Sequence, residues 1–159
     1  MILIFLLLVI QSCSPVQSNQ GTAQLRETFT TEVKVDQEVK NSESLNPEKP
    51  LVLKLELSTF QLSVKRSTVR VFLDLPDATH LTSTDEKNYI GSFSTFGDAN
   101  SYAFNLNDFL SASKINNPKS FLNRKITLTL VPVTFDENKS VVISQIEVKS
   151  CTISSFADR

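Results

Sequence analysis

The chain has 159 residues, with 16 Lys and Arg against 17 Asp and Glu, so its charge is nearly balanced. Its basic residues form no cluster or stripe, which argues against nucleic-acid binding, because phosphate contacts require grouped cations. Its one histidine, His80, is too few for a two-copper, zinc-hydrolase or cupin metal site, since each of these uses several imidazoles. We therefore expect no catalytic set, no cofactor and no enzymatic activity.

An apolar segment opens the chain and ends beside a cysteine. Residues 2–10 are all apolar, a run with the length of a signal-peptide core, whereas a membrane-spanning helix needs about 20 such residues. Cys13 follows a small residue just beyond this run, which resembles the lipobox of bacterial lipoproteins, where the cysteine becomes the lipidated first residue. No Lys or Arg precedes the run and Gln11 departs from the pattern, so a different start and ordinary secretory cleavage near Ser14 are the alternatives. We predict export to the cell envelope, with a lipid at Cys13 as the membrane anchor.

The rest of the sequence is organised as a tether followed by one domain. Residues 14–27 are mostly polar and are predicted to form a disordered tether after the 1–13 leader. Residues 28–153 are enough for one domain with a substantial core and too few for two. Residues 154–159 are predicted to be a short tail.

Cys151 is the cysteine that remains in the folded part. If Cys13 is lipidated, no disulfide can join the two; if cleavage falls earlier, a Cys13–Cys151 bridge is an alternative. We predict an ordinary residue at a strand end. An exposed thiol that pairs with another chain is the remaining interpretation.

Alternation of apolar and polar residues predicts strands throughout the domain. Residues 28–39 alternate as in a weak or edge strand, whereas every odd position of 51–57 is Leu. The same period of two recurs as far as residue 153. In chain order, the predicted strands are 28–39, 51–57, 68–75, 88–96, 102–106, 125–135 and 141–153.

Two features interrupt this strand pattern. Asn107 or Asp108 is predicted to cap the N-terminus of one or two helical turns over 109–113, which 116–118 (Asn-Asn-Pro) would end. Gly91 lies in the middle of a strand, and a glycine there predicts a β-bulge or a close approach of another segment.

The number and spacing of these elements predict the fold class. Six to eight short strands with one short helical turn are typical of an antiparallel β-sandwich of the jelly-roll or Greek-key kind. The eleven Phe and the many β-branched residues agree with this all-β fold. Three Gly are too few for a propeller or a Gly-rich repeat array.

His80 is the first candidate for a catalytic role. It follows Asp74 and Asp77 and precedes Ser83 and Asp85 in one polar loop. A Ser-His-Asp triad is defined by geometry, so proximity within a loop does not establish one. A solvated loop histidine is the favoured interpretation, and a hydrolase that uses His80 is the alternative.

The acidic loop residues Asp77, Asp85, Glu86 and Asp98 are weak candidates for a calcium site. Ca²⁺ requires several clustered oxygen ligands, and these residues have no fixed ligand spacing. Solvated surface carboxylates are the favoured interpretation, so no metal site is predicted.

Four aromatic residues admit two interpretations. Phe93, Phe96, Tyr102 and Phe104 lie at strand spacing, where aromatic rings either fill the core or line a sugar-binding face. The core is the favoured interpretation, and the chain contains no Trp.

Four stretches taken in order resemble the small C-terminal domain of tyrosinases and polyphenol oxidases. None is specific alone, and the resemblance as a whole extends over about 51–149, most of the folded part. They are 69–78 (VRVFLDLPDA), 89–93 (YIGSF), 104–110 (FNLNDFL), and 126–132 (ITLTLVP) with the returning strand 141–148.

The resemblance implies a fold and a role. In these enzymes the domain is a β-sandwich that packs over the copper domain, shields its mouth and often inserts a side chain near the metals. It does no chemistry itself, and the His-rich catalytic part has no counterpart in this chain. Phe96 is the candidate for the inserted, partner-facing side chain.

We therefore expect a stand-alone, lipid-anchored, non-catalytic β-sandwich that binds or shields a partner protein, with a tyrosinase-type copper oxidase as the candidate partner. The main alternative is a carbohydrate- or calcium-dependent binding module at the cell surface. A purely structural envelope protein would leave no distinguishing mark in the sequence.

Overall fold

The computed structural model describes residues 26–41, 50–64, 67–95, 100–115, 117–134 and 141–155. The leader, most of the tether, Cys13, Phe96 and Asp98 lie outside these ranges, so the predictions made for them stay predictions. Within the described ranges, no helix has the length and apolar character needed to cross a membrane.

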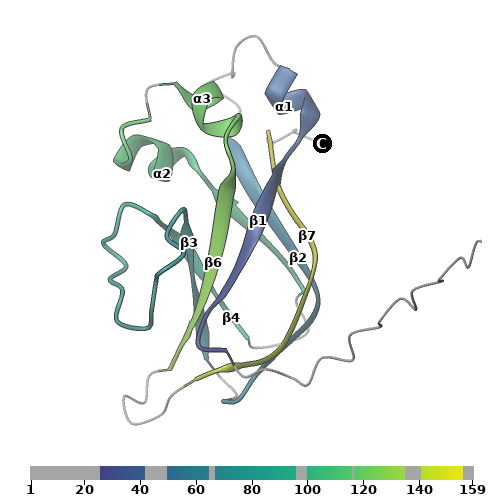
Figure 1. The fold of residues 1–159 in the computed structure, drawn as a ribbon, viewed down its shortest axis with the longest axis vertical. Coiled ribbons are helices and arrows are strands. Elements are labelled where there is room, and N and C mark those ends of the chain that lie inside the picture. The colour runs from purple at the N-terminus through teal and green to yellow at the C-terminus, as the bar shows by residue number, and fades with distance from the viewer. Residues whose placement is uncertain are drawn as a thin grey trace, which may run out of the picture.

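The described residues form a β-sandwich that is nearly closed into a barrel (Figure 1), which confirms the predicted fold class. The strands are hydrogen-bonded in the order β4-β3-β6-β1-β7-β2-β5, and every pair is antiparallel except β1 with β7. Their bounds are β1 (Phe29–Val35), β2 (Leu51–Leu62), β3 (Thr68–Leu73), β4 (Tyr89–Ser94), β5 (Ser101–Asn105), β6 (Ile126–Val133) and β7 (Ile143–Ser155).

Strand β1 joins the two layers of the sandwich. Its residues Phe29 to Val33 pair with β6, while Lys34 and Val35 pair with β7, so the strand passes from one layer to the other. A strand is found within the predicted range 28–39, but it ends at Val35 and lies between two paired strands, so the predicted edge position and length are wrong. Alternation shows which faces of a strand are polar, but it does not show whether the backbone edges are paired.

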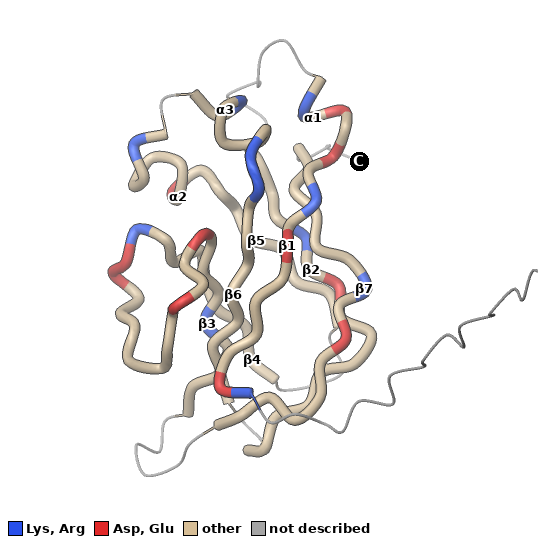
Figure 2. The backbone as a smooth tube through the Cα atoms, in the orientation of Figure 1, with Lys and Arg blue, Asp and Glu red and all other residues tan. Residues whose placement is uncertain are grey.

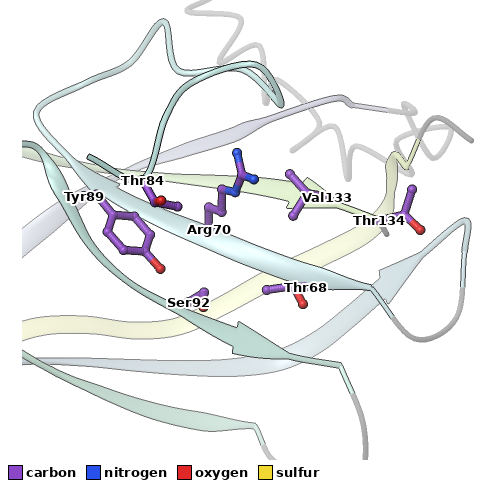
Figure 3. Close-up of a pocket in the computed structure, with 7 residues that line it drawn as sticks. All are labelled: Thr68, Arg70, Thr84, Tyr89, Ser92, Val133 and Thr134. Carbon is purple, nitrogen blue, oxygen red and sulfur yellow. The ribbon is translucent and has the colours of Figure 1, made fainter. Parts of the chain in front are cut away.

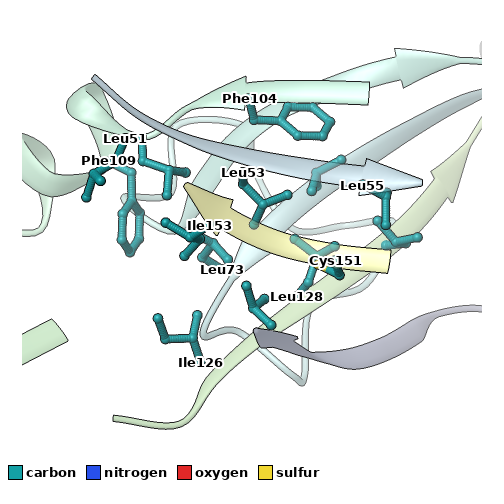
Figure 4. Close-up of a cluster of buried hydrophobic side chains, with 14 of the residues drawn as sticks. Leu51, Leu53, Leu55, Leu73, Phe104, Phe109, Ile126, Leu128, Cys151 and Ile153 are labelled. Carbon is teal, nitrogen blue, oxygen red and sulfur yellow. The ribbon is translucent and has the colours of Figure 1, made fainter. Parts of the chain in front are cut away.

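The core lies between the two layers and contains inward side chains of all seven strands. Figure 4 shows these side chains gathered between β2, β7 and the β3–β6 layer. Every odd Leu of the 51–57 segment belongs to it, as predicted, and Leu53 and Leu55 are fully buried. Other fully buried members are Val69, Val71, Leu73, Ile126, Leu128, Leu130 and Ile153.

Helices gather at one end of the sandwich (Figure 1), and the described residues contain three instead of the one predicted. They are α1 (Gln37–Asn41), α2 (Asn107–Ala112) and α3 (Pro118–Leu122). Helix α1 begins where the predicted first strand was expected to continue, and it buries Val39.

The caps of α2 and α3 differ from the prediction. Leu106 is the N-cap of α2 and makes no side-chain cap hydrogen bond, so neither Asn107 nor Asp108 has the expected role. Asn117 was interpreted as part of a helix stop, but its Oδ1 accepts a hydrogen bond from the Ser120 amide and caps α3. Asn followed by Pro118 at the first helical position is a helix-start signal, so these two residues begin a helix and do not end one.

Gly91 meets both predictions made for it. The β3–β4 register shifts between Val71 and Phe72, opposite Gly91, which marks a bulge. Gly91 has φ 145°, and a Cβ there would lie 2.9 Å from Cδ1 of Phe104 on β5. The Phe104 ring therefore packs directly on the glycine backbone, where β4 and β5 approach each other.

Candidate functional site: a loop-covered pocket on the outer face

The polar loop between β3 and β4, residues 74–88, folds back over the outer face of its own sheet (Figure 1). Beneath it lies a small second cluster in which Phe72, Ala78 and Val131 are each at most 2% exposed. Tyr89 packs on the edge of this cluster, with its ring centroid 5.6 Å from that of Phe72. The loop thus covers apolar surface and is part of the folded domain.

Arg70 holds this loop to the sheet. The residue lies on β3, and its side chain faces outward because Val69 and Val71 on either side of it are in the core. Its Nη1 donates to the carbonyl oxygens of His80 at 3.2 Å and of Thr82 at 2.9 Å. Two carbonyls of the loop are therefore bonded to one guanidinium nitrogen.

Further hydrogen bonds fix the backbone of the loop. The Thr79 amide donates to Oγ1 of Thr82 at 2.8 Å, and the Thr82 amide donates back to the Thr79 carbonyl at 2.9 Å. At the end of the loop, the Asn88 side-chain amide donates to the Leu73 carbonyl at 2.6 Å. On this braced loop, Leu81 is 82% exposed, and it is the one large hydrophobic residue of the described ranges that is strongly exposed.

A pocket of about 170 Å³ lies beside Arg70 on this outer face (Figure 3). Figure 3 shows the guanidinium in the middle, with hydroxyl-bearing side chains around it and Val133 to one side. Strands β3, β4 and β6 supply most of the lining, and the loop supplies one residue. The lining residues are Thr68, Arg70, Thr84, Tyr89, Ser92, Val133 and Thr134.

Arg70 carries a charge that no described carboxylate neutralises. Asp74, the acid nearest to it in the sequence, pairs with Arg124 instead. On the loop, Asp85 accepts a hydrogen bond from the Ser83 hydroxyl at 3.3 Å. Ion pairs elsewhere in the described ranges join exposed residues of other strands. Along the described backbone both signs of charge are interspersed (Figure 2), in keeping with the lack of a basic stripe in the sequence.

The structure does not assemble the residues of the considered triad. The His80 side chain is exposed, and its backbone carbonyl, not its imidazole, is the group that Arg70 binds. Ser83 donates to Asp85, and the Asp85 amide donates back to the Ser83 hydroxyl at 3.1 Å, so these two residues are occupied with each other. This geometry agrees with a solvated loop histidine.

The calcium candidates are only partly described. Asp77, Asp85 and Glu86 are exposed residues of the 74–88 loop, and Asp98 lies outside the described ranges. Among the described residues, no three acidic, His or Cys side chains come together as ligands for a metal ion. A calcium site that includes Asp98 stays a prediction.

The aromatic residues form part of the core. Phe93 and Phe104 are each 7% exposed, and Tyr102 stacks on Phe93 with ring centroids 3.9 Å apart. Burial raises the pKa of the Tyr102 hydroxyl. These three residues therefore follow the core interpretation, and Phe96 lies outside the described ranges.

Cys151 is free and buried on β7, where it pairs with Leu55 of β2. It is 4% exposed, and desolvation raises the pKa of its thiol from 9.0 to about 12. An exposed thiol poised to pair with another chain is therefore wrong. Cys151 also lies inside β7, which continues to Ser155. It is therefore not at a strand end, and the tail predicted from residue 154 begins later than expected.

The sequence analysis missed the pocket around Arg70. An Arg between two core valines reads as an ordinary solvated position of a half-buried strand. The signal that could have been used was the short polar loop that begins right after this strand, because it can reach back to the outward side chains. The partners of Arg70 are backbone carbonyls, and those leave no trace in residue types.

The described domain is thus an all-β sandwich whose outer face is partly covered by one braced loop. No protein-family model and no curated protein matches the chain. Among solved structures, that of latent apple tyrosinase is similar, with a TM-score of 0.50 and 17% identity, over 82% of this chain and 26% of the tyrosinase. At this identity the similarity shows the shared fold.

Two structures of latent aurone synthase, a polyphenol oxidase, are also similar to the chain. The recombinantly expressed form has a TM-score of 0.47 and 20% identity, over 94% of this chain and 28% of that protein. The form from the natural source has a TM-score of 0.46 and 18% identity, over 90% and 27%. The chain spans about a quarter of the length of these proteins.

Proposed function

We propose that this chain is a non-catalytic covering domain that docks on a partner protein and shields a surface of it, with a tyrosinase-type copper oxidase as the candidate partner. The observation that carries the proposal is the fold shared with latent apple tyrosinase, which matches 82% of this chain but 26% of the tyrosinase. We take the matched quarter to be the C-terminal shielding domain. The ordered stretches of sequence that resemble that domain, from 69–78 to 126–132, support this assignment.

Leu81 is the residue that we assign to the contact with the partner. A side chain that enters a partner's cavity gains the most when it is apolar and its backbone is already fixed, because less entropy is lost on binding. Leu81 is 82% exposed on a loop that Arg70 and the Thr79–Thr82 bonds hold in place. Phe96 keeps its place as the second candidate.

A pair of charge variants tests the docking surface. Leu81→Asp places a carboxylate where we expect an apolar contact, and Ser111→Asp adds the same charge at an exposed position of α2. Tagged chains are crosslinked on membranes, recovered and analysed by mass spectrometry. We expect wild type and Ser111→Asp to recover a His-rich copper oxidase, and Leu81→Asp to recover at least about tenfold less, as for a binding hot spot.

Activity then separates covering from mere association. Titrating the recovered oxidase with the wild-type chain is expected to slow phenol oxidation, and Leu81→Asp is expected to require at least about tenfold more protein for the same effect. Recovery of no partner protein would overturn the covering role. Recovery of envelope glycans alone would in addition favour the carbohydrate-binding alternative. Equal inhibition by the wild-type chain and by Leu81→Asp would show that Leu81 is not part of the contact.

The location at the cell envelope is the second part of the proposal. Its support is the apolar run of 2–10 followed by Cys13, as in a lipobox. We expect labelled palmitate to be incorporated into the wild-type chain and into Cys151→Ala, since Cys151 is buried, but not into Cys13→Ala. A Cys13→Ala chain that keeps both the label and its membrane association would contradict lipid anchoring.

A further inference from the structure

The pocket beside Arg70 has features of a ligand site that the covering role does not require. We propose that it binds a small organic carboxylate, whose charged group pairs with the free side of the Arg70 guanidinium and whose apolar body lies against Val133 and the Tyr89 ring. The proposal requires neither Leu81 nor a partner protein. Arg70 is common to both proposals, but its Nη1 supports the loop whereas the ligand would use its other donors and the pocket lining.

The guanidinium is fixed in place but only partly used. Arg carries five N–H donors, two of them on each terminal nitrogen. Nη1 donates to the carbonyls of His80 and Thr82, and no other hydrogen bond or ion pair of Arg70 occurs among the described residues. Nη2 and Nε are therefore left as a pair of parallel donors, the geometry that binds a carboxylate in bidentate fashion.

Side chains with hydroxyl groups share the pocket lining with this cation. Thr68 on β3, Ser92 on β4 and Thr84 on the loop line the pocket with Arg70, and Tyr89 adds a phenol (Figure 3). Ser92 lies directly opposite Arg70 in the β3–β4 register. Hydroxyls donate to the oxygens of an anion without a charge of their own, so the set favours a single negative group over a cation.

The size and the walls of the pocket limit the ligand. A volume of about 170 Å³ is below the roughly 300–1,000 Å³ of sites for drug-sized molecules, so the ligand is of the size of one ring or a short chain. Val133 and the Tyr89 ring, which pack against the apolar cluster under the loop, offer non-polar surfaces on two sides of Arg70 (Figure 3). A carboxylate with a small apolar body matches this combination better than an inorganic anion does.

A purely structural role for Arg70 is the competing explanation. Bonds to two carbonyls through one nitrogen do hold the loop, but they use neither the hydroxyls of the pocket lining nor the remaining donors. The negative charges of Asp85 and Glu86 on the loop disfavour the binding of an anion. They are exposed, so salt screens their effect, and Asp85 is bonded to Ser83. We therefore expect binding to be weak, with a dissociation constant in about the millimolar range for a one-ring ligand.

Titration followed by amide NMR provides the test, with benzoate as the probe. We expect saturable shifts confined to β3, β4 and the 74–88 loop, with weaker binding of acetate, which lacks the apolar body, and of benzyl alcohol, which lacks the charge. Equal binding of benzyl alcohol would overturn the role of Arg70 as the anion partner. Tighter binding of inorganic phosphate than of benzoate would overturn the organic carboxylate.

Two variants separate ligand binding from loop support. Ser92→Phe places a ring in the pocket without removing a partner of the bonds between Arg70 and the loop, so we expect it to weaken benzoate binding at least tenfold. Ala103→Phe, at an exposed position of the other edge strand β5, is the matched control and is expected to bind like wild type. Unchanged binding in Ser92→Phe would overturn the proposal even if Leu81 proved to be the partner contact.

Discussion

Asp74 is the residue on which the turn after β3 depends. It has φ 52°, a left-handed conformation that Asp and Asn tolerate better than most residues. Its Oδ1 accepts a hydrogen bond from the Thr127 amide on β6 at 3.1 Å, and its Oδ2 pairs with Arg124 just before that strand. Arg124 in turn lies over the Phe121 ring of α3, 5.1 Å from its centroid. One carboxylate therefore ties the loop, β6 and the helical end together.

Two substitutions at Asp74 separate these contributions. Asp74→Ala removes the acceptor of the partly buried Thr127 amide and places Ala at positive φ, so we expect unfolding free energy to fall by about 2–4 kcal/mol. Asp74→Asn keeps one oxygen acceptor and the tolerated backbone, and loses an ion pair in which Arg124 is half exposed, which costs at most about 1 kcal/mol. Urea unfolding measures both, and equal costs would contradict the role of the Thr127 bond.

Cys151 predicts a dependence of stability on alkaline pH. Its thiol has a pKa raised by burial to about 12 in the folded protein, against 9.0 for an unperturbed thiol. Between these values the unfolded chain loses the proton first and binds fewer protons. The contribution of the Cys151 thiol to the unfolding free energy is therefore fully present below pH 9. It is lost at up to about 1.4 kcal/mol per pH unit as the pH rises toward 12.

The comparison with Cys151→Ala isolates this effect. The variant leaves a small cavity at every pH, but it lacks the thiol, so its deficit in unfolding free energy is expected to shrink above pH 9. Urea titrations of both chains at several pH values give this difference. A deficit that stays constant up to pH 10.5 would show that the thiol is not shielded as its burial indicates.

At the scale of elements, the approach of β4 to β5 depends on one glycine. Gly91 combines φ 145° with the Phe104 ring at the position where a Cβ would lie. Gly91→Ala is expected to lower unfolding free energy by about 1–3 kcal/mol, since both the backbone conformation and the contact are unfavourable for Ala. Urea unfolding of this variant beside Ser92→Ala provides the measurement.

The control and a second variant divide this cost. Ser92 lies next to Gly91 on an edge strand, is exposed and has no positive φ, so Ser92→Ala is expected to change stability by less than about 0.5 kcal/mol. Adding Phe104→Leu to Gly91→Ala removes the contact with the ring but leaves the unfavourable φ at residue 91. The difference between the single and the double variant therefore reports the cost of the contact. If Gly91→Ala behaved like Ser92→Ala, the close approach of the two strands would not exist in solution.

At the scale of the whole molecule, β7 closes the sandwich. It pairs antiparallel with β2 along most of its length and parallel with β1 through Thr152 and Ile153. The Asp36 amide, just after β1, also donates to the Ile153 carbonyl at 2.9 Å. The last residues of the strand therefore join elements from opposite ends of the chain.

Truncation tests this closing role. A chain that stops after Lys149 loses Cys151 and Ile153 from the core and leaves the first half of β2 paired with β5 alone. We expect it to lose cooperative unfolding in urea and its near-ultraviolet circular dichroism. A chain that stops after Ser155 keeps every paired residue of β7 and is expected to match the full chain. Cooperative unfolding of the shorter chain would contradict the closing role.

Much of the sandwich follows from local pattern. The odd Leu residues of β2 and the inward Val69, Val71 and Leu73 of β3 are buried as their alternation predicts, because a strand turns successive side chains to opposite faces. Gly91 likewise predicted the bulge, because a glycine in the middle of a strand is typical of such a position. These are properties of single strands, and one sequence contains them in full.

Features that depend on contacts with distant segments of the chain were not contained in this local pattern. Alternation in β1 could not show that both of its edges are paired. The start of α3 differs, because its Asn117-Pro118 signal is local and is present in the sequence. The pocket is the extreme case, because Arg70 is held by the carbonyls of a loop that folds back from ten residues further on.

The sequence by itself determined which residues form strands and which side of each strand faces the core, because the two-residue period and burial of apolar side chains are local properties. Only the tertiary structure decided the order of the strands, the layer change in β1 and the pocket under the loop. These features arise from backbone hydrogen bonds between distant segments, and every residue type except proline offers the same donor and acceptor for them.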